Sequence, residues 1–295
     1  MGERVVSGAS EDDPAARGRR QLTEGRVAPM TTAVSEKRVA TLRGEANPRI
    51  QIAGEGPPVV YLHGAMGLVW DGFLDSLSQE HTVYAPEHPG TTPGDPDGIK
   101  AVDDLWDLVL HYYDLFDQLG LESPAIVGHS FGGMVAAEIA ATNPDRASKL
   151  VLISPVGLWR DDVPVAQFLT MSPSEVAEIA FFDPKGPVAE QVMAVPEDPE
   201  AAVETALRTT WSQACTGKFM WPLPEKGLRK RLYRIKAPTL IVWGNQDRLV
   251  PPAYAEEFAD RIANSRVQKF DKAAHLPQLE QLEAVSKTVR EFLAG

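Results

Sequence analysis

The feature that most constrains the fold of this chain is a glycine-rich segment around a serine, GHSFGG at residues 128–133. It follows the apolar run at residues 125–127, typical of a buried strand, and precedes an alanine-rich stretch to Thr142, typical of a helix. A serine in the pattern G-x-S-x-G between a strand and a helix predicts a sharp turn that exposes its hydroxyl. Glycines are needed there because the flanking chain passes too close for Cβ atoms. We therefore expect Ser130 to be a nucleophile.

Buried strands and helices alternate along most of the chain. Apolar runs typical of strands buried on both faces lie at residues 58–64, 82–85, 125–128, 149–154 and 239–244. A more polar run at 266–270 is expected nearer a sheet edge, and short alternating patterns at 38–43 and 48–53 predict an antiparallel hairpin. Helical patterns cover residues 103–119, 132–142, 253–263 and 277–293. This order predicts an α/β fold with a mostly parallel sheet covered by helices on both faces.

One stretch interrupts this alternation. No buried strand is evident between residues 155 and 234, where the chain is helix-friendly and rich in aromatic and methionine side chains. We interpret residues 155–234 as a helical cap inserted over the carboxyl ends of the strands, where ligands bind in open α/β sheets. Trp159 and Trp211 are candidate substrate contacts, although most aromatic residues of the cap are expected to form its own core. Residues 34–154 and 235–295 then form the core domain.

Residues 1–33 are predicted to be a disordered tail. They mix acidic residues with arginines and lack the apolar segment of a secretory signal. Met30 is an alternative start of translation. No apolar run in the sequence approaches the roughly 18 residues of a membrane span, so a cytoplasmic protein is the expectation.

Composition argues against several classes of function. The formal net charge of −12 disfavours binding to nucleic acid, which needs basic surfaces. Cys215 is the single cysteine, so no internal disulfide can form, and no base lies beside it in sequence to activate it. It is expected to be a half-buried thiol in a helix. No histidine or carboxylate cluster has metal-ligand spacing, so neither a metal nor another cofactor is expected.

Two later segments complete a pattern with Ser130. Residues 243–251 read WGNQDRLVP and residues 273–280 read AAHLPQLE. Together with the serine segment they resemble the α/β-hydrolase superfamily over about residues 34–294, in which an acid and then a histidine follow the serine. The resemblance implies an eight-stranded type of sheet and a triad of Ser130, Asp247 and His275. Asp271 is an alternative acid, but Asp247 follows a strongly apolar strand and is preferred.

The triad suits nucleophilic chemistry. A serine hydroxyl is a weak nucleophile at neutral pH, so His275 would take its proton, while Asp247 holds the useful tautomer. The segment HGAMG at residues 63–67 resembles the HGxxG loop of the family. This implies that the backbone N–H groups of Ala65 and Phe131 form an oxyanion hole.

Neighbouring residues receive secondary predictions. Gly64 and Trp70 are candidate substrate contacts, with Phe73 as a further wall of the acyl pocket. Among the other histidines, His63 is expected to fix its loop, and the side chain of His129 is expected to point away into the fold. His111 is expected to be solvated or structural.

The resemblance leaves the substrate open. Many family members carry D-x-P-G-x-G-x-S where residues 86–95 read PEHPGTTPGD, so the loop beside the cleft departs from the pattern. A serine nucleophile argues against the branches that use an aspartate. Our leading hypothesis is hydrolysis of a small to medium-sized, largely apolar ester-type acyl substrate. The alternatives are a C–C bond hydrolase of ring-fission diketones, which usually has Asn where His129 stands, and a non-catalytic ligand receptor on the same fold.

Overall fold

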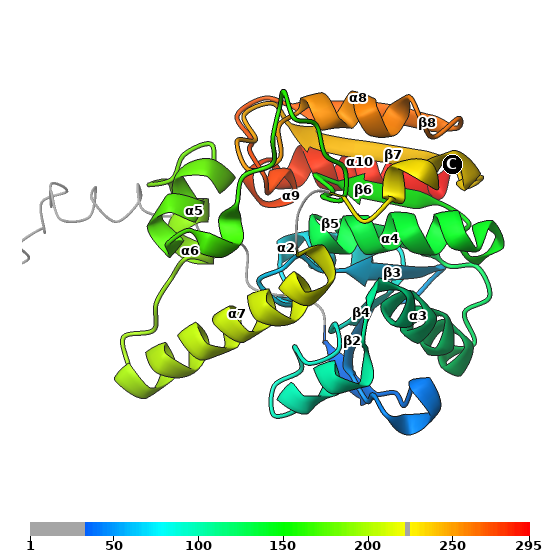
Figure 1. The fold of residues 1–295 in the computed structure, drawn as a ribbon, viewed down its shortest axis with the longest axis horizontal. Helices are drawn as coiled ribbons and strands as arrows, with labels where there is room; N and C mark the ends of the chain where they lie inside the picture. Colours follow the sequence, from blue (N-terminus) through cyan, green and yellow to red (C-terminus); the bar gives the residue numbers. More distant parts are fainter. Residues whose placement is uncertain (1–32, 222–224) are drawn as a thin grey trace, which may run out of the picture.

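The computed structural model describes residues 33–221 and 225–295 and has one sheet at its centre. The strands are Ser35–Arg38 (β1), Arg49–Ala53 (β2), Pro58–Leu62 (β3), Thr82–Pro86 (β4), Ala125–His129 (β5), Leu150–Ile153 (β6), Thr239–Gly244 (β7) and Ser265–Phe270 (β8). Their order across the sheet is β1-β2-β4-β3-β5-β6-β7-β8 (Figure 1). The pairs β1–β2 and β2–β4 are antiparallel, and all other neighbours are parallel. The predicted mostly parallel eight-stranded sheet is confirmed.

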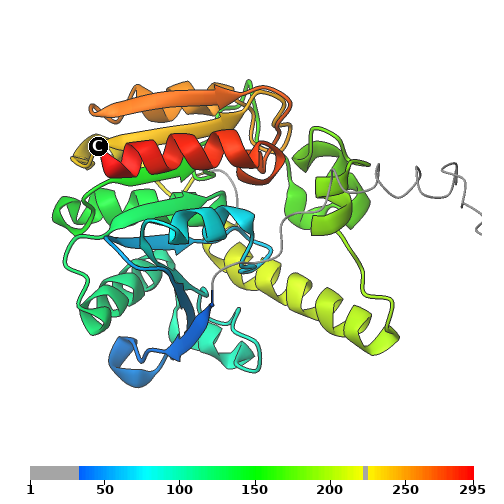
Figure 2. The ribbon, with the colours of Figure 1, turned by 180° about the vertical axis from the view of Figure 1, so that it is seen from behind.

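Helices cover both faces of the sheet. The α-helices are Gly72–Ser78 (α2), Leu105–Leu119 (α3), Phe131–Thr142 (α4), Pro173–Ala180 (α5), Pro187–Val192 (α6), Pro199–Met220 (α7), Ala253–Ala259 (α8), Pro277–Glu280 (α9) and Leu282–Ala294 (α10). Helices α3, α4 and α8 lie on the face toward the reader in Figure 1, and α2 and α10 lie on the face seen in Figure 2. Short 3-10 turns occur at Leu42–Gly44, Pro96–Ala101, Pro144–Arg146, Phe168–Thr170, Leu228–Lys230 and Leu232–Arg234.

Successive residues of each central strand serve the two faces. On β6, Leu150 and Leu152 join the apolar core on the α4 side, whereas Val151 and Ile153 join the core on the α10 side. All four side chains are fully buried. This explains why the strands read as continuous apolar runs in the sequence.

The first strand ends earlier than predicted. β1 stops at Arg38, and beyond it a single isolated bridge continues the pairing. The chain turns here because the backbone N–H of Leu42 donates to the carboxylate of Asp114 on α3, at 2.8 Å, and Leu42 adopts a φ of 51°. A contact with a distant helix thus overrides the local strand pattern.

The last helix is interrupted where the sequence predicted a continuous one. Gln281 has φ −127° and ψ 48°, which separates α9 from α10. Its side-chain amide donates to the carbonyl oxygen of Lys272 at 3.1 Å, in the loop after β8. The break therefore anchors this loop, which carries His275.

The predicted cap interval is helical. Between β6 and β7 the described residues, 154–221 and 225–238, contain α5, α6 and α7 and no strand. Figures 1 and 2 both show these helices together beside the end of the sheet at which the parallel strands terminate. Within the described part of the chain, no helix combines the length and the apolar character needed to cross a bilayer. The predicted tail and the alternative start at Met30 lie outside the described residues, apart from residue 33.

Candidate active site

The chain reverses sharply at Ser130, between β5 and α4. Ser130 has φ 54° and ψ −115°, a backbone conformation that is strained for a serine. A Cβ atom on Gly128 would lie 2.4 Å from the carbonyl oxygen of Gly132, and one on Gly132 would lie 2.0 Å from the carbonyl oxygen of Leu62. Glycine is required at both positions because backbone passes directly against them.

The side chains of Ser130, His275 and Asp247 converge beyond the carboxyl ends of β5, β8 and β7. His275 Nε2 lies 2.9 Å from Ser130 Oγ, and His275 Nδ1 lies 2.9 Å from Asp247 Oδ2. A carboxylate only accepts hydrogen bonds, so Nδ1 carries the proton and Nε2 is left to accept from the serine hydroxyl. All three residues are buried. In this arrangement an imidazole can remove a proton from an attacking hydroxyl.

The carboxylate of Asp247 is fixed on its far side. Its Oδ1 atom accepts from the backbone N–H groups of Leu249 and Val250 at 2.9 and 2.8 Å, which leaves Oδ2 facing His275. Asp271, the alternative acid, is exposed and accepts instead from the side-chain amide of Asn245 at 2.7 Å. The structure therefore brings Asp247, and not Asp271, to the histidine.

Two backbone N–H groups are available beside the serine. Phe131 is the first residue of α4, where N–H groups have no partner within the helix. In the described residues neither this group nor the N–H of Ala65 donates a hydrogen bond to another protein atom. Gly64 lies against the serine, since a Cβ atom on it would be 3.5 Å from Ser130 Cβ. The loop that contains Ala65 is thus adjacent to the nucleophile.

A buried network of two histidines holds this loop. His63 Nδ1 donates to the carbonyl oxygen of Gly64 at 2.7 Å, and His63 Nε2 accepts from the backbone N–H of His88 at 3.1 Å. His88 Nε2 donates to the carbonyl oxygen of His63 at 2.9 Å, so its Nδ1 accepts from the hydroxyl of Tyr112. Burial lowers the pKa of His88 to about 4 and the pKa of His63 well below its usual value. Both rings are therefore neutral.

Removing the hydroxyl of Tyr112 is expected to destabilise the protein through this network. In Tyr112→Phe the buried Nδ1 atom of His88 loses its donor, and a buried unsatisfied acceptor costs about 1–3 kcal/mol. The free energy of unfolding in urea should fall by that amount with an unchanged m value. Tyr113→Phe is the matched control, because Tyr113 is only half-buried and its hydroxyl bonds to the carbonyl oxygen of Ile139 and to Thr142, not to this network. Equal losses in the two variants would contradict the role given to Tyr112.

His129 lies beside the triad, which corrects the expectation that it points away. Its Nε2 atom donates to the backbone carbonyl oxygen of His275 at 2.9 Å, and the two rings are 5.2 Å apart between centroids. Burial, followed by the proximity of His275, lowers the pKa of His129 to about 3. A neutral His129 thus supports the backbone of His275. The only hint in the sequence was its position next to Ser130.

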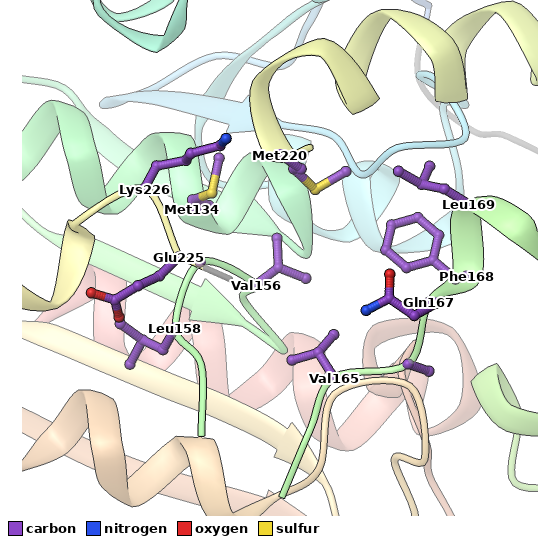
Figure 3. Close-up of a pocket in the computed structure, with 12 residues that line it drawn as sticks. Met134, Val156, Leu158, Val165, Gln167, Phe168, Leu169, Met220, Glu225 and Lys226 are labelled. Carbon is purple, nitrogen blue, oxygen red and sulfur yellow. The ribbon is translucent and has the colours of Figure 1, made fainter. Parts of the chain in front are cut away.

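A narrow cavity lies near the turn at Ser130, and Figure 3 shows the side chains that line it. It borders Met134, one turn after Ser130 on α4, and Val156, whose N–H donates to the Ser130 carbonyl oxygen at 3.2 Å. Its volume of about 20 Å³ has room for about one water molecule. The rest of the wall consists of Gly157, Leu158, Val165, Ala166, Gln167, Phe168, Leu169, Met220, Glu225 and Lys226. The wall is therefore largely apolar and comes mainly from the cap.

The aromatic residues predicted to contact substrate do not line this cavity. Trp70 and Phe73 are buried in the core on the α2 side of the sheet. Trp159 and Trp211 belong to the cap, but neither is part of the cavity wall. The indole N–H groups of Trp70, Trp159 and Trp211 donate to Asp75 Oδ1, Asp161 Oδ1 and the carbonyl oxygen of Gly90. Contact of Trp70, Trp159 and Trp211 with substrate stays a prediction from residue type.

No metal site emerges from the side chains. Within residues 33–221 and 225–295, no group of three or more histidine, cysteine, aspartate or glutamate residues is arranged to hold a metal ion. Cys215 is more deeply buried than predicted, and burial raises the pKa of its thiol to about 11. The nucleophilic candidate therefore remains Ser130.

Comparison with known proteins identifies similar chains. A family model described as the alpha/beta hydrolase family matches residues 59–288. The 2-hydroxy-6-oxo-6-phenylhexa-2,4-dienoate hydrolase of Burkholderia cepacia is 26% identical over 279 residues, which cover 86% of this chain and 94% of that protein. Polyketide synthase ThaQ of Burkholderia thailandensis is 29% identical over 268 residues, which cover 85% of this chain but only 12% of the synthase.

Solved structures are similar in fold. Naproxen esterase from Bacillus subtilis has a TM-score of 0.69 and 18% sequence identity, with 89% of this chain and 92% of the esterase covered. At this identity the likeness concerns the fold alone. The similar proteins thus include one relative named for a dienoate substrate and one structure of the same fold named as an esterase.

Proposed function

Because the chain belongs to the alpha/beta hydrolase family and is a hydrolase, we propose that the bond it cleaves is a carboxylic ester. The reaction passes through an acyl-enzyme on Ser130. The observation that carries this proposal is the continuous hydrogen-bonded line from Ser130 through His275 to Asp247. We take the acyl group to be small to medium-sized and largely apolar, and the largely apolar wall of the cavity near Ser130 supports the second property.

The first half of the reaction forms the ester between substrate and enzyme. Ser130 Oγ attacks the carbonyl carbon while His275 Nε2 takes the hydroxyl proton. The imidazolium that results is stabilised by Asp247, whose carboxylate is already oriented by two backbone N–H groups. As the tetrahedral intermediate collapses, His275 returns the proton to the alcohol that leaves.

The negative oxygen of the intermediate is met by the N–H groups of Ala65 and Phe131. Preorganised donors of this kind each contribute about 3 kcal/mol to stabilisation of the transition state. The histidine network around His63 keeps the first donor in place without adding charge, since both of its rings are neutral. In the second half, His275 activates a water molecule that releases the acid from Ser130.

An acyl chain can occupy this cavity only when the cap opens. A cavity of about 20 Å³ is too small for an acyl chain. The wall segment around Phe168 and Leu169 comes from the cap, and its side chains would have to turn outward. Such opening would admit the substrate, and reclosure would exclude bulk water from the acyl-enzyme.

A C–C bond hydrolase is the second candidate, favoured by the similarity to the Burkholderia cepacia enzyme. That enzyme is named for a dienoate, whose carboxylate would call for a cation in the pocket. Here Lys226 lies in the wall, but its Nζ donates to the carbonyl oxygen of Trp221 at 2.9 Å and Glu225 is its neighbour. The cavity therefore suits an uncharged apolar acyl group better.

A substrate panel separates these two candidates. p-Nitrophenyl esters of increasing acyl length would be compared with 2-hydroxy-6-oxo-6-phenylhexa-2,4-dienoate. We expect kcat/KM to be greater for the best ester by at least about tenfold. A preference of the same size for the dienoate would replace the ester proposal with the C–C one. Absence of both activities, together with failure to react with a fluorophosphonate, would favour a ligand receptor.

A further inference from the structure

The end of α5, in the cap, is bonded to the two loops that carry the acid and the histidine. Carbonyl groups in the last turn of a helix have no partner within the helix. Here the carbonyl of Ala180 accepts from the backbone N–H of His275 at 2.9 Å. The carbonyl of Ile179 accepts from the backbone N–H of Arg248, the residue after Asp247, at 3.3 Å. The cap thus satisfies backbone donors in both loops.

One carboxylate completes this junction from the side of the core. Glu280 Oε1 accepts from the backbone N–H of Phe182, in the cap, at 2.7 Å. Glu280 Oε2 accepts from the backbone N–H of Ala274, the residue before His275, also at 2.7 Å. Hydrogen bonds to a charged acceptor are about twice as strong as those between neutral groups. Glu280 therefore joins the cap directly to the loop of the histidine.

From this juxtaposition we propose that Glu280 is a positioning residue, which holds the loop of His275 against the cap. Seating of the cap and alignment of the imidazole with Ser130 then occur together. The inference rests on the ester hydrolysis proposed above. Glu280 does not touch Ser130 and acts only through the backbone on either side of the histidine.

The geometry makes His275 sensitive to this contact. Its backbone N–H is held by Ala180 and its backbone carbonyl by His129, so the position of the loop decides where the ring lies. Ala274 is fully buried, and without Glu280 its N–H would be left without an acceptor. Buried N–H groups are nearly always paired, so the loop would shift to find a partner. A misplacement of about 1 Å can lower a catalysed rate about 100-fold.

The test compares Glu280→Gln with Glu283→Gln, which makes the same change of charge at an exposed position three residues later. Glutamine keeps one carbonyl oxygen but directs an NH₂ group at the other donor. In Glu280→Gln we expect the rate of labelling by a small fluorophosphonate, and kcat for p-nitrophenyl acetate, to fall about 10- to 100-fold. KM should change by less than about threefold, and Glu283→Gln should match the wild type.

A second variant removes one of the two cap donors to Glu280, since the backbone N–H of Asp183 also interacts with this carboxylate. Phe182→Pro deletes the backbone N–H that donates to Glu280 Oε1. Phe181 already has the extended conformation, φ −116° and ψ 147°, that suits a residue before proline. If the two residues act through one contact, Glu280→Gln should have a smaller effect on the labelling rate in the Phe182→Pro background than in the wild type. If the fold-reductions in labelling rate of the two single variants multiply in the double variant, the proposed link to the cap is wrong.

Hydrogen exchange supplies a readout that does not depend on activity. Backbone amides of residues 178–183 and 272–276 should exchange faster in Glu280→Gln than in Glu283→Gln. If the wild type neither labels nor hydrolyses esters, the proposed function fails while the exchange data still test the link. If the wild type is active and Glu280→Gln equals Glu283→Gln in rate and exchange, the role of Glu280 is wrong. A lower melting temperature with unchanged rates per folded molecule would reduce Glu280 to a structural residue.

Discussion

Ser130→Ala is expected to lower kcat/KM for every ester that the wild type cleaves by about 10⁴- to 10⁶-fold. The variant loses the only atom that forms a covalent bond with the acyl group, whereas the two oxyanion donors and the cavity remain. Fluorophosphonate labelling should disappear as well, as read by intact-protein mass spectrometry. The melting temperature should stay near that of the wild type, because alanine keeps the same Cβ at the same backbone angles.

Survival of ester turnover in purified Ser130→Ala would remove the basis of the proposed mechanism. Contamination is the main competing explanation for a small residual rate. Titration of the Ser130→Ala preparation with a fluorophosphonate measures any contaminating serine hydrolase. A residual rate that belongs to the variant itself and depends on His275 would fall in the double variant with His275→Gln. Residues that act as a unit are strongly non-additive, so the double variant should be no slower than the single one.

Asp247→Asn should lower kcat about 10⁴-fold while leaving the fold intact. The reason lies in the two backbone donors on the far side of this residue. They would hold the amide oxygen where Oδ1 now lies, which turns the NH₂ group toward His275 Nδ1. Nδ1 would then become the acceptor, and the proton would move to Nε2. In that tautomer the ring cannot accept the proton of Ser130.

The matched control for this prediction is Asp271→Asn. Asp271 is the other aspartate near the histidine in sequence, but its carboxylate is exposed and bonded to Asn245. Its kcat should remain within about twofold of the wild type, as is usual for surface substitutions. A large loss in Asp271→Asn with a small one in Asp247→Asn would mean that the acid had been misassigned. Steady-state kinetics at one pH decide between them.

Much of the fold was predictable because local patterns and global packing agree here. Strands such as β6 are buried on both faces, so they read as unbroken apolar runs. The glycines on either side of Ser130 are needed for steric reasons that are visible in the sequence. Since parallel strands end at one edge of a sheet, segments after β5, β7 and β8 had to meet there. The predicted trio of side chains meets at that edge.

What the sequence did not reveal depends on contacts between distant segments. His88 appeared only as a departure from a family motif, and its bond to Tyr112 on α3 joins residues far apart in the chain. The position of Glu280 against the cap likewise follows from a fold that no local pattern encodes. Residue type alone did not indicate where Trp70 packs, which is in the apolar core on the α2 side of the sheet.

At Ser130, thermal stability and catalytic turnover favour different residues, because the backbone has a positive φ. Glycine adopts a φ of 54° without penalty, whereas a side chain there costs about 1–3 kcal/mol. Ser130→Gly would therefore raise the thermal stability of the protein and abolish its activity in one step. Directed evolution that selects only for thermal stability would therefore favour inactive variants. Each round must also select for formation of product.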